Sequence, residues 1–246
     1  MLLTFLYHGI NKGRYATVKE MIEKHLTYLS SRYNIVVPGD KLSFFKLNIC
    51  LTFDDAYFDF YAHIFPLLKK FNIKAVLAVP IKFIQEKTDL KDSVRLSIPS
   101  YYAMKEKKNL KKVPFCTWEE LKEMSDSEHV VIASHSFTHV NLMQENLNLH
   151  REIVESKNFI EKKLGKNIST FVYPLGKFNE KVHKMVKKHY RYAMRIGSAW
   201  NFSWQNFSGI IYRVISDGIS RVDEHIRFPC FFSYLWFYLL NSVRKR

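Results

Sequence analysis

Short apolar runs alternate with amphipathic stretches along most of this chain, and this alternation constrains its fold more than any other feature. A run of five or six apolar residues is typical of a strand buried on both faces, whereas the stretches between the runs have helical periodicity. Strands that alternate with helices imply a parallel sheet, either a closed barrel or an open doubly wound sheet. The predicted strands are residues 2–7, 49–53, 74–79, 130–134, 169–173, 191–196 and 210–215.

Helix signals fill the intervals between these strands. Thr117, followed three residues later by Glu120, is a capping-box pattern that predicts the start of a helix, and Gly165 is expected to end another. Residues 81–115 show no clear period and are expected to form an insertion or a long loop. The other predicted helices are residues 16–31, 57–71, 147–164 and 179–188, with further helices after residue 215.

Two polar pairs directly follow predicted strands. Asp54 and Asp55 follow one strand, and His135 and His139 follow another. The carboxyl ends of parallel strands meet at one rim, so these four side chains are expected to converge there. One carboxylate and two neutral imidazoles suit Zn²⁺ or a similar divalent ion with a position left open for water. The second carboxylate would then be free to act as a base on that water.

Each half of this constellation also has a plainer interpretation. Adjacent acids after a strand often cap the next helix, and two histidines spaced in this way can belong to an ordinary polar loop. The combination is more specific than either half. Adjacent carboxylates repel one another, and a cation bound to one of them relieves that repulsion.

Length and charge limit the class of protein. The chain has 246 residues, which a single α/β barrel commonly occupies, so two large domains are not expected. Its 38 Lys and Arg against 23 Asp and Glu give a net charge of +15, which favours anionic partners. Basic residues interleaved with aromatic stacking platforms are not evident, so we expect an anionic phospholipid surface and no nucleic acid.

The two ends of the chain bear on where it works. Residues 1–8 read as a strand and not as a signal sequence, so we expect a cytoplasmic protein, at the inner face of the membrane if it binds lipid. Residues 228–240 are rich in aromatic side chains and precede the basic residues 244–246, which is typical of a membrane-interfacial segment. A terminal helix packed on the outside of a barrel is an equally good interpretation. The chain is therefore divided into a catalytic barrel, residues 1–218, and a C-terminal helical tail, residues 219–246.

Three motifs in this order resemble the first three motifs of the polysaccharide deacetylases that carry a NodB-type domain (carbohydrate esterase family 4). They are Leu-Thr-Phe-Asp-Asp at 51–55, Ser-His-Ser-Phe-Thr-His at 134–139 and Phe-Val-Tyr-Pro-Leu-Gly at 171–176. The resemblance extends over most of residues 1–215. It implies a distorted (β/α) barrel of about seven parallel strands. It also implies an enzyme that removes acetyl groups from N-acetylated sugars with a divalent metal.

The resemblance assigns roles to individual residues. Asp54 would be the general base, and Asp55, His135 and His139 would hold the metal, which we expect to be Zn²⁺. The backbone N–H of Leu175 would help to hold the tetrahedral oxyanion.

Two positions depart from the family pattern. Val172 takes the place of an arginine that orients the base carboxylate, and Arg213 is the expected substitute. The general acid usually comes from a late Leu-x-His motif, which is absent after residue 215, but residues 6–8 are Leu-Tyr-His. This order resembles the circularly permuted subgroup that deacetylates biofilm poly-N-acetylglucosamine, so His8 is expected to protonate the leaving amine. A surface arginine and a histidine bonded to backbone are the plainer alternatives.

Four residues are expected to contact the substrate. Tyr173 and Pro174 lie in the third motif, where Pro174 helps to shape the turn that exposes the Leu175 amide. Trp200 and Trp204 fall in the predicted loop 197–209, where their rings could stack on sugars. Packing in the core or at the rim is the more common role for each tryptophan taken alone.

The preferred hypothesis is a metal-dependent deacetylase that acts on an N-acetylated sugar or glycan. A glycosyltransferase would also use paired acids to hold a divalent ion, but imidazole is a poor ligand for Mg²⁺. A non-catalytic sugar-binding protein of the same fold is the third hypothesis, because Val172 and the missing late histidine depart from the active pattern. Bound zinc and released acetate would separate these hypotheses.

Overall fold

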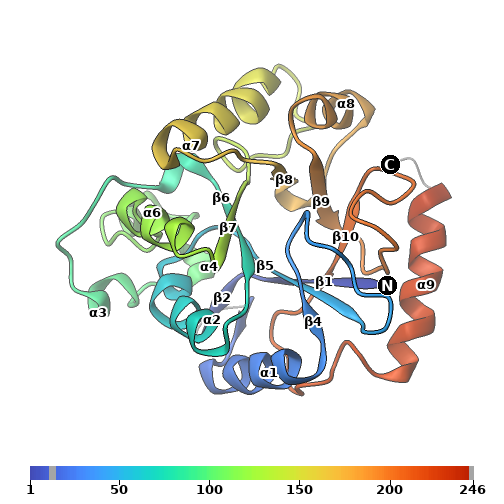
Figure 1. Ribbon diagram of the computed structural model, residues 1–246. Helices are drawn as coiled ribbons and strands as arrows, with labels where there is room; N and C mark the ends of the chain where they lie inside the picture. The colour runs from blue at the N-terminus through green and yellow to red at the C-terminus, as the bar shows by residue number, and fades with distance from the viewer. Residues whose placement is uncertain (11–14, 244–246) are drawn as a thin grey trace.

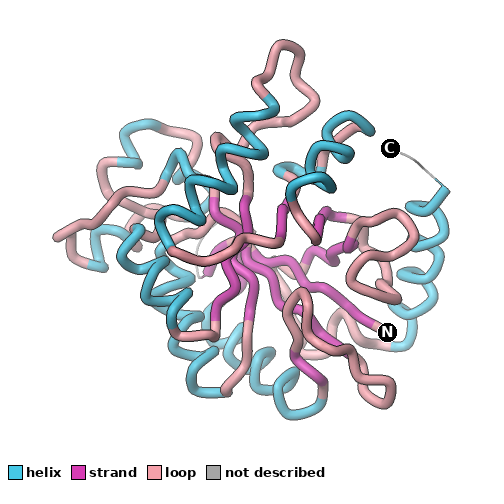
Figure 2. The backbone as a smooth tube through the Cα atoms, turned by 45° about the horizontal axis from the view of Figure 1, so that its top comes forward, coloured by secondary structure: helices cyan, strands magenta, loops and turns pink. Residues whose placement is uncertain are grey.

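A barrel of parallel strands forms the centre of the molecule, and helices surround it (Figures 1 and 2). The computed structural model describes residues 1–10 and 15–243. Within these residues seven strands follow the order β1-β10-β9-β8-β7-β6-β5, and β1 also pairs with β5, which closes the ring. This closure confirms the predicted distorted (β/α) barrel. The strands are β1 (Leu2–Tyr7), β5 (Asn48–Phe53), β6 (Ala75–Val79), β7 (Val130–Ser134), β8 (Thr170–Val172), β9 (Tyr192–Ile196) and β10 (Ile211–Ile215).

Strand β1 joins the two ends of the barrel sequence. Its register with β5 runs from Leu2 opposite Asn48 to Tyr7 opposite Phe53, and on its other side Phe5 lies opposite Val214 of β10. The first barrel strand therefore lies beside the last one. Three shorter strands lie outside the ring, where β4 pairs with β5 and β2 pairs with β3: β2 (Gly9–Ile10), β3 (Ala16–Thr17) and β4 (Asn34–Ile35).

Side chains alternate between two apolar layers along the strands. In β5, Ile49 and Leu51 belong to the large cluster shared with the helices, whereas Cys50 belongs to a smaller cluster contributed mainly by the strands. The smaller cluster fills the barrel interior. Because side chains on one face recur at every second residue, the row of Cys50 continues through Thr52 to Asp54, which emerges from the interior at the carboxyl rim.

Helices cover the outside of the ring. The predicted capping box is present, since the Thr117 Oγ1 accepts from the Glu120 N–H at 3.3 Å and the Glu120 carboxylate accepts from the Thr117 N–H at 2.8 Å. Gly165 ends its helix in the left-handed conformation, with φ of 68°. Two π-helical segments, Phe60–Ile64 and Arg151–Glu155, lead into helices. The covering helices are α1 (Lys19–Arg32), α2 (Phe65–Phe71), α6 (Trp118–Asp126), α7 (Ser156–Leu164) and α8 (Glu180–His189).

Residues 81–115 are more ordered than their sequence indicates. Three one-turn helices interrupt the segment: α3 (Asp92–Arg95), α4 (Ser100–Ala103) and α5 (Lys107–Leu110). Arg95 is buried, donates to the carbonyls of Val113 and Phe115, and pairs with Glu120 of α6. Helices of one turn are too short to show a period, so the sequence pattern could not reveal them.

The C-terminal region forms one helix within the described residues, α9 (Phe228–Val243), where several were predicted. It lies along one side of the barrel (Figure 1). Tyr234 is buried and its carbonyl accepts from the Trp200 N–H at 3.4 Å, while the Asn241 side chain donates to the Gly197 carbonyl at 2.8 Å. Neither this helix nor any other described one has the length and apolar character needed to cross a bilayer.

Candidate metal centre and catalytic cavity

A cavity of about 450 Å³ lies at the carboxyl ends of the strands. Eight of the residues chosen from the sequence line it: His8, Asp54, Asp55, His135, His139, Tyr173, Leu175 and Arg213. The cavity therefore gathers residues from the ends of β1, β5, β7, β8 and β10. Its lining also includes residues that the sequence did not single out, namely Tyr15, Tyr57, Met104, Lys105, Gly176, Ile196, Ile215 and Asp217.

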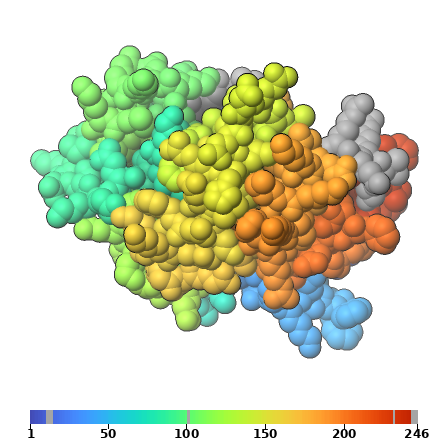
Figure 3. Space-filling model, turned by 90° about the horizontal axis from the view of Figure 1, so that it is seen from above, coloured from blue at the N-terminus to red at the C-terminus, as the bar shows by residue number. Residues whose placement is uncertain are grey.

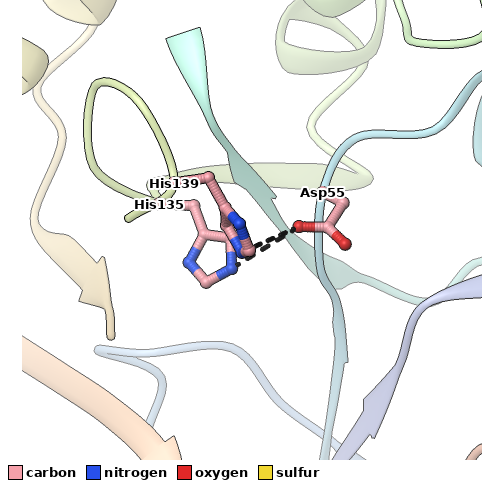
Figure 4. A group of neighbouring side chains, drawn as sticks. All are labelled: Asp55, His135 and His139. Carbon is pink, nitrogen blue, oxygen red and sulfur yellow. Dashed lines mark ion pairs between the residues drawn. The ribbon is translucent and has the colours of Figure 1, made fainter. Parts of the chain in front are cut away.

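Asp55, His135 and His139 form the candidate metal centre (Figure 4). Each offers one ligand atom, and these atoms all lie within 4.8 Å of one another. Oδ1 of Asp55 lies 3.7 Å from Nε2 of His135 and 3.3 Å from Nε2 of His139. The structure thus brings together the three residues that the resemblance implied as ligands.

The hydrogen bonding and protonation of these ligand atoms suit a divalent cation. Oδ1 of Asp55 is buried and has no hydrogen-bond partner among the described residues, which is costly for a carboxylate oxygen unless a cation satisfies it. Nδ1–H of His135 donates to the Val172 carbonyl at 2.9 Å, so the lone pair on its Nε2 faces Asp55. Burial lowers the pKa of His135 to about 4, which keeps the imidazole neutral as a ligand must be.

Backbone strain concentrates around this centre. Asp55, Ala56, Ser136, His139 and Leu175 all have φ between 51° and 74°, a region that residues other than glycine rarely adopt. Such conformations persist only where the surrounding structure enforces them, and they cluster at functional sites. The turns after β5, β7 and β8 are therefore shaped to aim groups into the cavity.

Glu152 fixes the loop that carries the two histidines. This glutamate is buried in the segment before α7, and its carboxylate accepts from the N–H groups of Phe137 and Thr138 at 3.0 and 2.9 Å. It also accepts from the Thr138 hydroxyl at 2.8 Å. Because these bonds fall between His135 and His139, Glu152 controls the spacing of the two imidazoles.

Arg213 holds the Asp54 carboxylate in a bidentate ion pair. Its Nη1 and Nη2 lie 2.6 and 2.8 Å from the two carboxylate oxygens, and all of these groups are buried. Burial opposes ionisation of Asp54, but the Arg213 charge and the nearby His135 together hold its pKa well below the usual value. Asp54 is therefore an ionised carboxylate in a fixed orientation.

The position of Arg213 explains how the chain does without an arginine at position 172. Val172 lies in the apolar cluster that fills the barrel interior, and so does Ile211, two residues before Arg213 on the same face of β10. Arg213 also contacts Thr52 at 3.2 Å, inside the barrel. Either strand can project a side chain into this interior, so a guanidinium from β10 reaches Asp54 from there.

His8 and Asp217 form a second charged pair in the cavity. Asp217 accepts from the His8 backbone N–H at 2.8 Å, and its other oxygen lies 2.7 Å from Nδ1 of the imidazole. Burial lowers the pKa of His8, but the hydrogen bond to Asp217 and the neighbouring carboxylates outweigh it and raise the pKa to about 9. His8 is thus protonated at neutral pH, with Nε2 as its remaining donor.

The third motif forms a tight turn beside the metal centre. Leu175 has φ of 58° inside a 3₁₀ turn at Pro174–Gly176, and its side chain is exposed. Tyr173 lines the cavity, and its hydroxyl lies 2.7 Å from Nδ1 of His183. Pro174 is buried beneath the turn and is not among the residues that line the cavity, so its contribution is to shape the turn.

The expectation that Trp200 and Trp204 contact a sugar is corrected by their positions. The bridge between Asn201 and Leu2 places their loop at the amino end of β1, away from the cavity. Trp200 is buried in the core against Tyr234, and the Trp204 indole donates to the Asp40 carbonyl at 2.7 Å. Both indoles therefore pack within the protein, as the plainer interpretation had it.

Among the residues that the sequence analysis missed, Asp217, Glu152 and Tyr57 contribute polar groups next to the candidate metal centre or its partners. Asp217 lies two residues after β10, so its place at a strand end was a usable signal. Glu152 lies in a helical region and Tyr57 forms an isolated bridge with Phe115, and no sequence pattern distinguishes them from surface residues. Burial and the nearby Asp55 raise the pKa of Tyr57 well above its usual value, so it stays a neutral phenol beside the metal centre.

Comparison with known proteins agrees with this geometry. The family model described as polysaccharide deacetylase matches residues 46–193, which include the first three motifs. The protein YxkH of Bacillus subtilis, which bears the name polysaccharide deacetylase, is 25% identical over 193 residues. The match covers 74% of this chain and 60% of YxkH, so it spans less than two thirds of that relative.

Two solved structures share the fold. A polysaccharide deacetylase from Bacillus cereus is 20% identical with a TM-score of 0.71, over 92% of this chain and 67% of that one. IcaB from Ammonifex degensii is 19% identical with a TM-score of 0.68, over 87% of this chain and 91% of that one. At these identities the likeness is one of fold, and it agrees with the resemblance seen in the motifs.

Proposed function

Because this chain belongs to the polysaccharide deacetylase family, whose members are carbohydrate deacetylases and therefore hydrolases, we propose that it removes N-acetyl groups from an acetylated sugar or polysaccharide. One observation carries the proposal. The three candidate metal ligands, the ionised carboxylate of Asp54 and the protonated His8 all line the same cavity. Together these groups can activate a water molecule, accept its proton and protonate the leaving amine.

Asp55, His135 and His139 would hold a divalent ion, and their ligand types suit Zn²⁺ best. When bound, such an ion polarises the acetyl carbonyl and lowers the pKa of a water molecule. Glu152 and the Val172 carbonyl keep the ligands in place, as outer-shell partners of metal ligands commonly do.

Asp54 is the base in this mechanism. Its carboxylate is ionised and can take a proton from the attacking water. Arg213 fixes the plane of this carboxylate with two hydrogen bonds and, because it is buried inside the barrel, allows it little freedom to rotate. The arginine that the third motif lacks is thereby replaced in function by a residue from β10.

The backbone N–H of Leu175 would stabilise the oxyanion that forms as water adds to the carbonyl. The left-handed conformation of Leu175 orients this amide within a turn that lines the cavity. Tyr173 lies beside it and is the one predicted substrate contact with an aromatic ring on the cavity wall.

His8 would complete the reaction by protonating the leaving nitrogen. An amine is a much poorer leaving group than an alcohol unless it receives a proton, so a protonated histidine in the cavity favours amide over ester hydrolysis. Asp217 orients the imidazole through Nδ1 and stabilises its charged form. The buried imidazoles also disfavour the glycosyltransferase alternative, whose Mg²⁺ would require oxygen ligands.

The proposal is tested by acetate release from a panel of N-acetylated sugars by zinc-loaded protein. We expect Asp54→Asn to abolish release while retaining zinc, and His135→Ala to lose both release and most of the zinc. His8→Ala should slow turnover without loss of zinc. Glu155→Gln, an exposed change one turn from the loop-holding Glu152, is the control that should behave as the wild type. Wild-type protein that binds zinc and releases no acetate from any N-acetylated sugar would contradict the proposal.

A further inference from the structure

Exposed phenylalanine and tryptophan side chains gather in three segments of this protein. Among the described residues, every phenylalanine or tryptophan that is classed as exposed lies in loop 36–47, loop 197–209 or α9. They are Phe44, Phe45, Phe202, Phe207, Phe228, Phe232, Trp236 and Phe237. Such a restriction to three segments is unlike the scattered apolar residues of an ordinary surface.

These segments, which are far apart in sequence, contact one another. The Trp204 indole donates to the Asp40 carbonyl at 2.7 Å, which joins loop 197–209 to loop 36–47. The rings of Phe202 and Tyr238 lie 4.8 Å apart at an edge-to-face angle, which joins the same loop to α9. The three segments that carry the exposed phenylalanine and tryptophan rings therefore adjoin one another.

The tip of loop 36–47 is held in a position that exposes two rings to solvent. Phe44 is 99% exposed and Phe45 is fully exposed. Their turn is fixed by Asn48, whose side chain bonds to both the N–H and the carbonyl of Ser43, and by the Ser43 hydroxyl, which accepts from Phe45 and Lys46. The loop projects as the light-blue lobe at the lower edge of Figure 3.

Helix α9 is apolar on both faces. It contains no charged residue from Phe228 to Val243, and while Tyr234 packs into the core, Phe232, Trp236 and Leu239 are exposed. The helix lies at the outer edge of the molecule, with no other element beyond it (Figures 1 and 2). A helix that is apolar all round requires an apolar environment on its second face as well.

The charge pattern of these segments favours a lipid surface over a protein as their partner. The three segments contain one acidic residue, Asp40, whose carboxylate accepts from the Val37 N–H at 3.0 Å. Lys41 and Lys46 flank the two exposed phenylalanines, and Arg227 directly precedes α9. Fully exposed rings on a projecting turn require deep pockets in a protein partner, whereas the acyl region of a bilayer accepts them without any.

We propose that loop 36–47, loop 197–209 and α9 form one lipid-binding face that docks on a bilayer containing anionic phospholipid. The aromatic rings enter the interface between headgroups and acyl chains, and the flanking lysines and arginine lie against the headgroup phosphates. This face lies around the amino end of β1 and one flank of the barrel, so docking leaves the cavity at the carboxyl ends uncovered. Docking through this face does not depend on the proposed deacetylase activity.

Co-sedimentation of the full chain with vesicles tests the proposal. We expect binding to vesicles of phosphatidylcholine with 30% phosphatidylglycerol, weaker binding to pure phosphatidylcholine, and release as the salt concentration rises. The doubly substituted variants Phe44→Ser with Phe45→Ser and Phe232→Ser with Trp236→Ser should each lower the partition coefficient by about tenfold or more. Lys41→Ser with Lys46→Ser should lower binding only to the anionic vesicles.

Matched controls use exposed residues outside this face. Val94→Ser with Met143→Ser and Lys107→Ser with Lys111→Ser should bind vesicles as the wild type does. Circular dichroism and thermal unfolding check that each variant is folded, and sedimentation velocity reports its oligomeric state. The proposal would be overturned if the wild-type protein does not bind anionic vesicles. It would also be overturned if substitutions in this face disrupt a dimer and leave vesicle binding unchanged.

Discussion

Asp54 and His8 each have a partner of opposite charge, and the two partners suit the opposite roles that we propose for these residues. Arg213 keeps Asp54 ionised and able to accept a proton, whereas Asp217 keeps His8 protonated and able to donate one. Both partners come from β10 or the two residues after it. Strand β10 and the residues just after it therefore set the protonation of both the proposed base and the proposed acid.

Arg213→Lys should show that the arginine positions the base. Lysine keeps the positive charge but cannot make two parallel hydrogen bonds to a carboxylate, so Asp54 loses its fixed plane. We expect kcat for acetate release to fall by roughly 10- to 100-fold. Zinc content should stay unchanged. Arg191→Lys on the protein surface is the control, and an Arg213→Lys enzyme with wild-type kcat would exclude the positioning role.

Asp217→Asn should shift the pH dependence of the reaction. The raised pKa of His8, about 9, means that the acid is charged below that pH and lost above it. Replacing the carboxylate with a neutral amide lowers the pKa of His8, so activity should decline at a lower pH on the alkaline side. The profile of kcat against pH measures this shift, and coincident alkaline limbs for the two proteins would argue against His8 as the acid.

At the scale of elements, the loop after β7 depends on a residue in the following helical segment. Glu152→Gln should weaken metal binding, because a neutral amide oxygen accepts weaker hydrogen bonds from the Phe137 and Thr138 N–H groups than a carboxylate does, and the amide nitrogen cannot accept from the Thr138 hydroxyl. We expect zinc affinity to fall by roughly 10- to 100-fold in competition with a chelator. Glu155→Gln, one helical turn away and exposed, should have no effect. Equal affinity of both variants would show that the loop does not require Glu152.

The strand ends were predictable from sequence because short runs of apolar residues indicate where buried parallel strands end. This placed Asp54, Asp55, His135 and His139 at one rim, and Arg213 could be chosen as a partner because it belongs to a predicted strand. Pairings across the barrel were harder, since Arg213 and Asp54 are 159 positions apart and His8 and Asp217 are 209 apart. The tryptophans were misplaced because residues between β9 and β10 return to the amino end of the barrel, which no local pattern reveals.

At the scale of the whole molecule, His25 joins three separate parts of the fold. It is fully buried in α1, its Nδ1–H donates to the Val222 carbonyl, and its Nε2 lies 2.7 Å from the hydroxyl of Tyr7 in β1. Burial is the main reason that its pKa is lowered to about 4. The folded protein therefore holds this histidine neutral at a pH where the unfolded chain would protonate it.

Stability should consequently fall as the pH drops from 6.5 toward 4. The unfolded state binds more protons across this range, so the free energy of unfolding decreases as the pH falls. The stabilising contribution of His25 is fully present only above pH 6.5. We expect the wild type to lose roughly 2 kcal/mol more than His25→Gln between pH 7.5 and 4.5. Urea unfolding of both metal-free proteins at the two pH values measures this difference. His150→Gln, an exposed change, should lose as much as the wild type.

The placement of β1 between β10 and β5 has a consequence during synthesis on the ribosome. The barrel stays open, and His8 stays without Asp217, until the last strand has left the exit tunnel and paired with the first. Closing a ring between such distant segments is slow, because a long stretch of polypeptide must become ordered first. A nascent chain thus acquires its candidate metal ligands before it acquires the carboxylate that holds His8 in its charged form, so the proposed acid is incomplete until translation has passed residue 217.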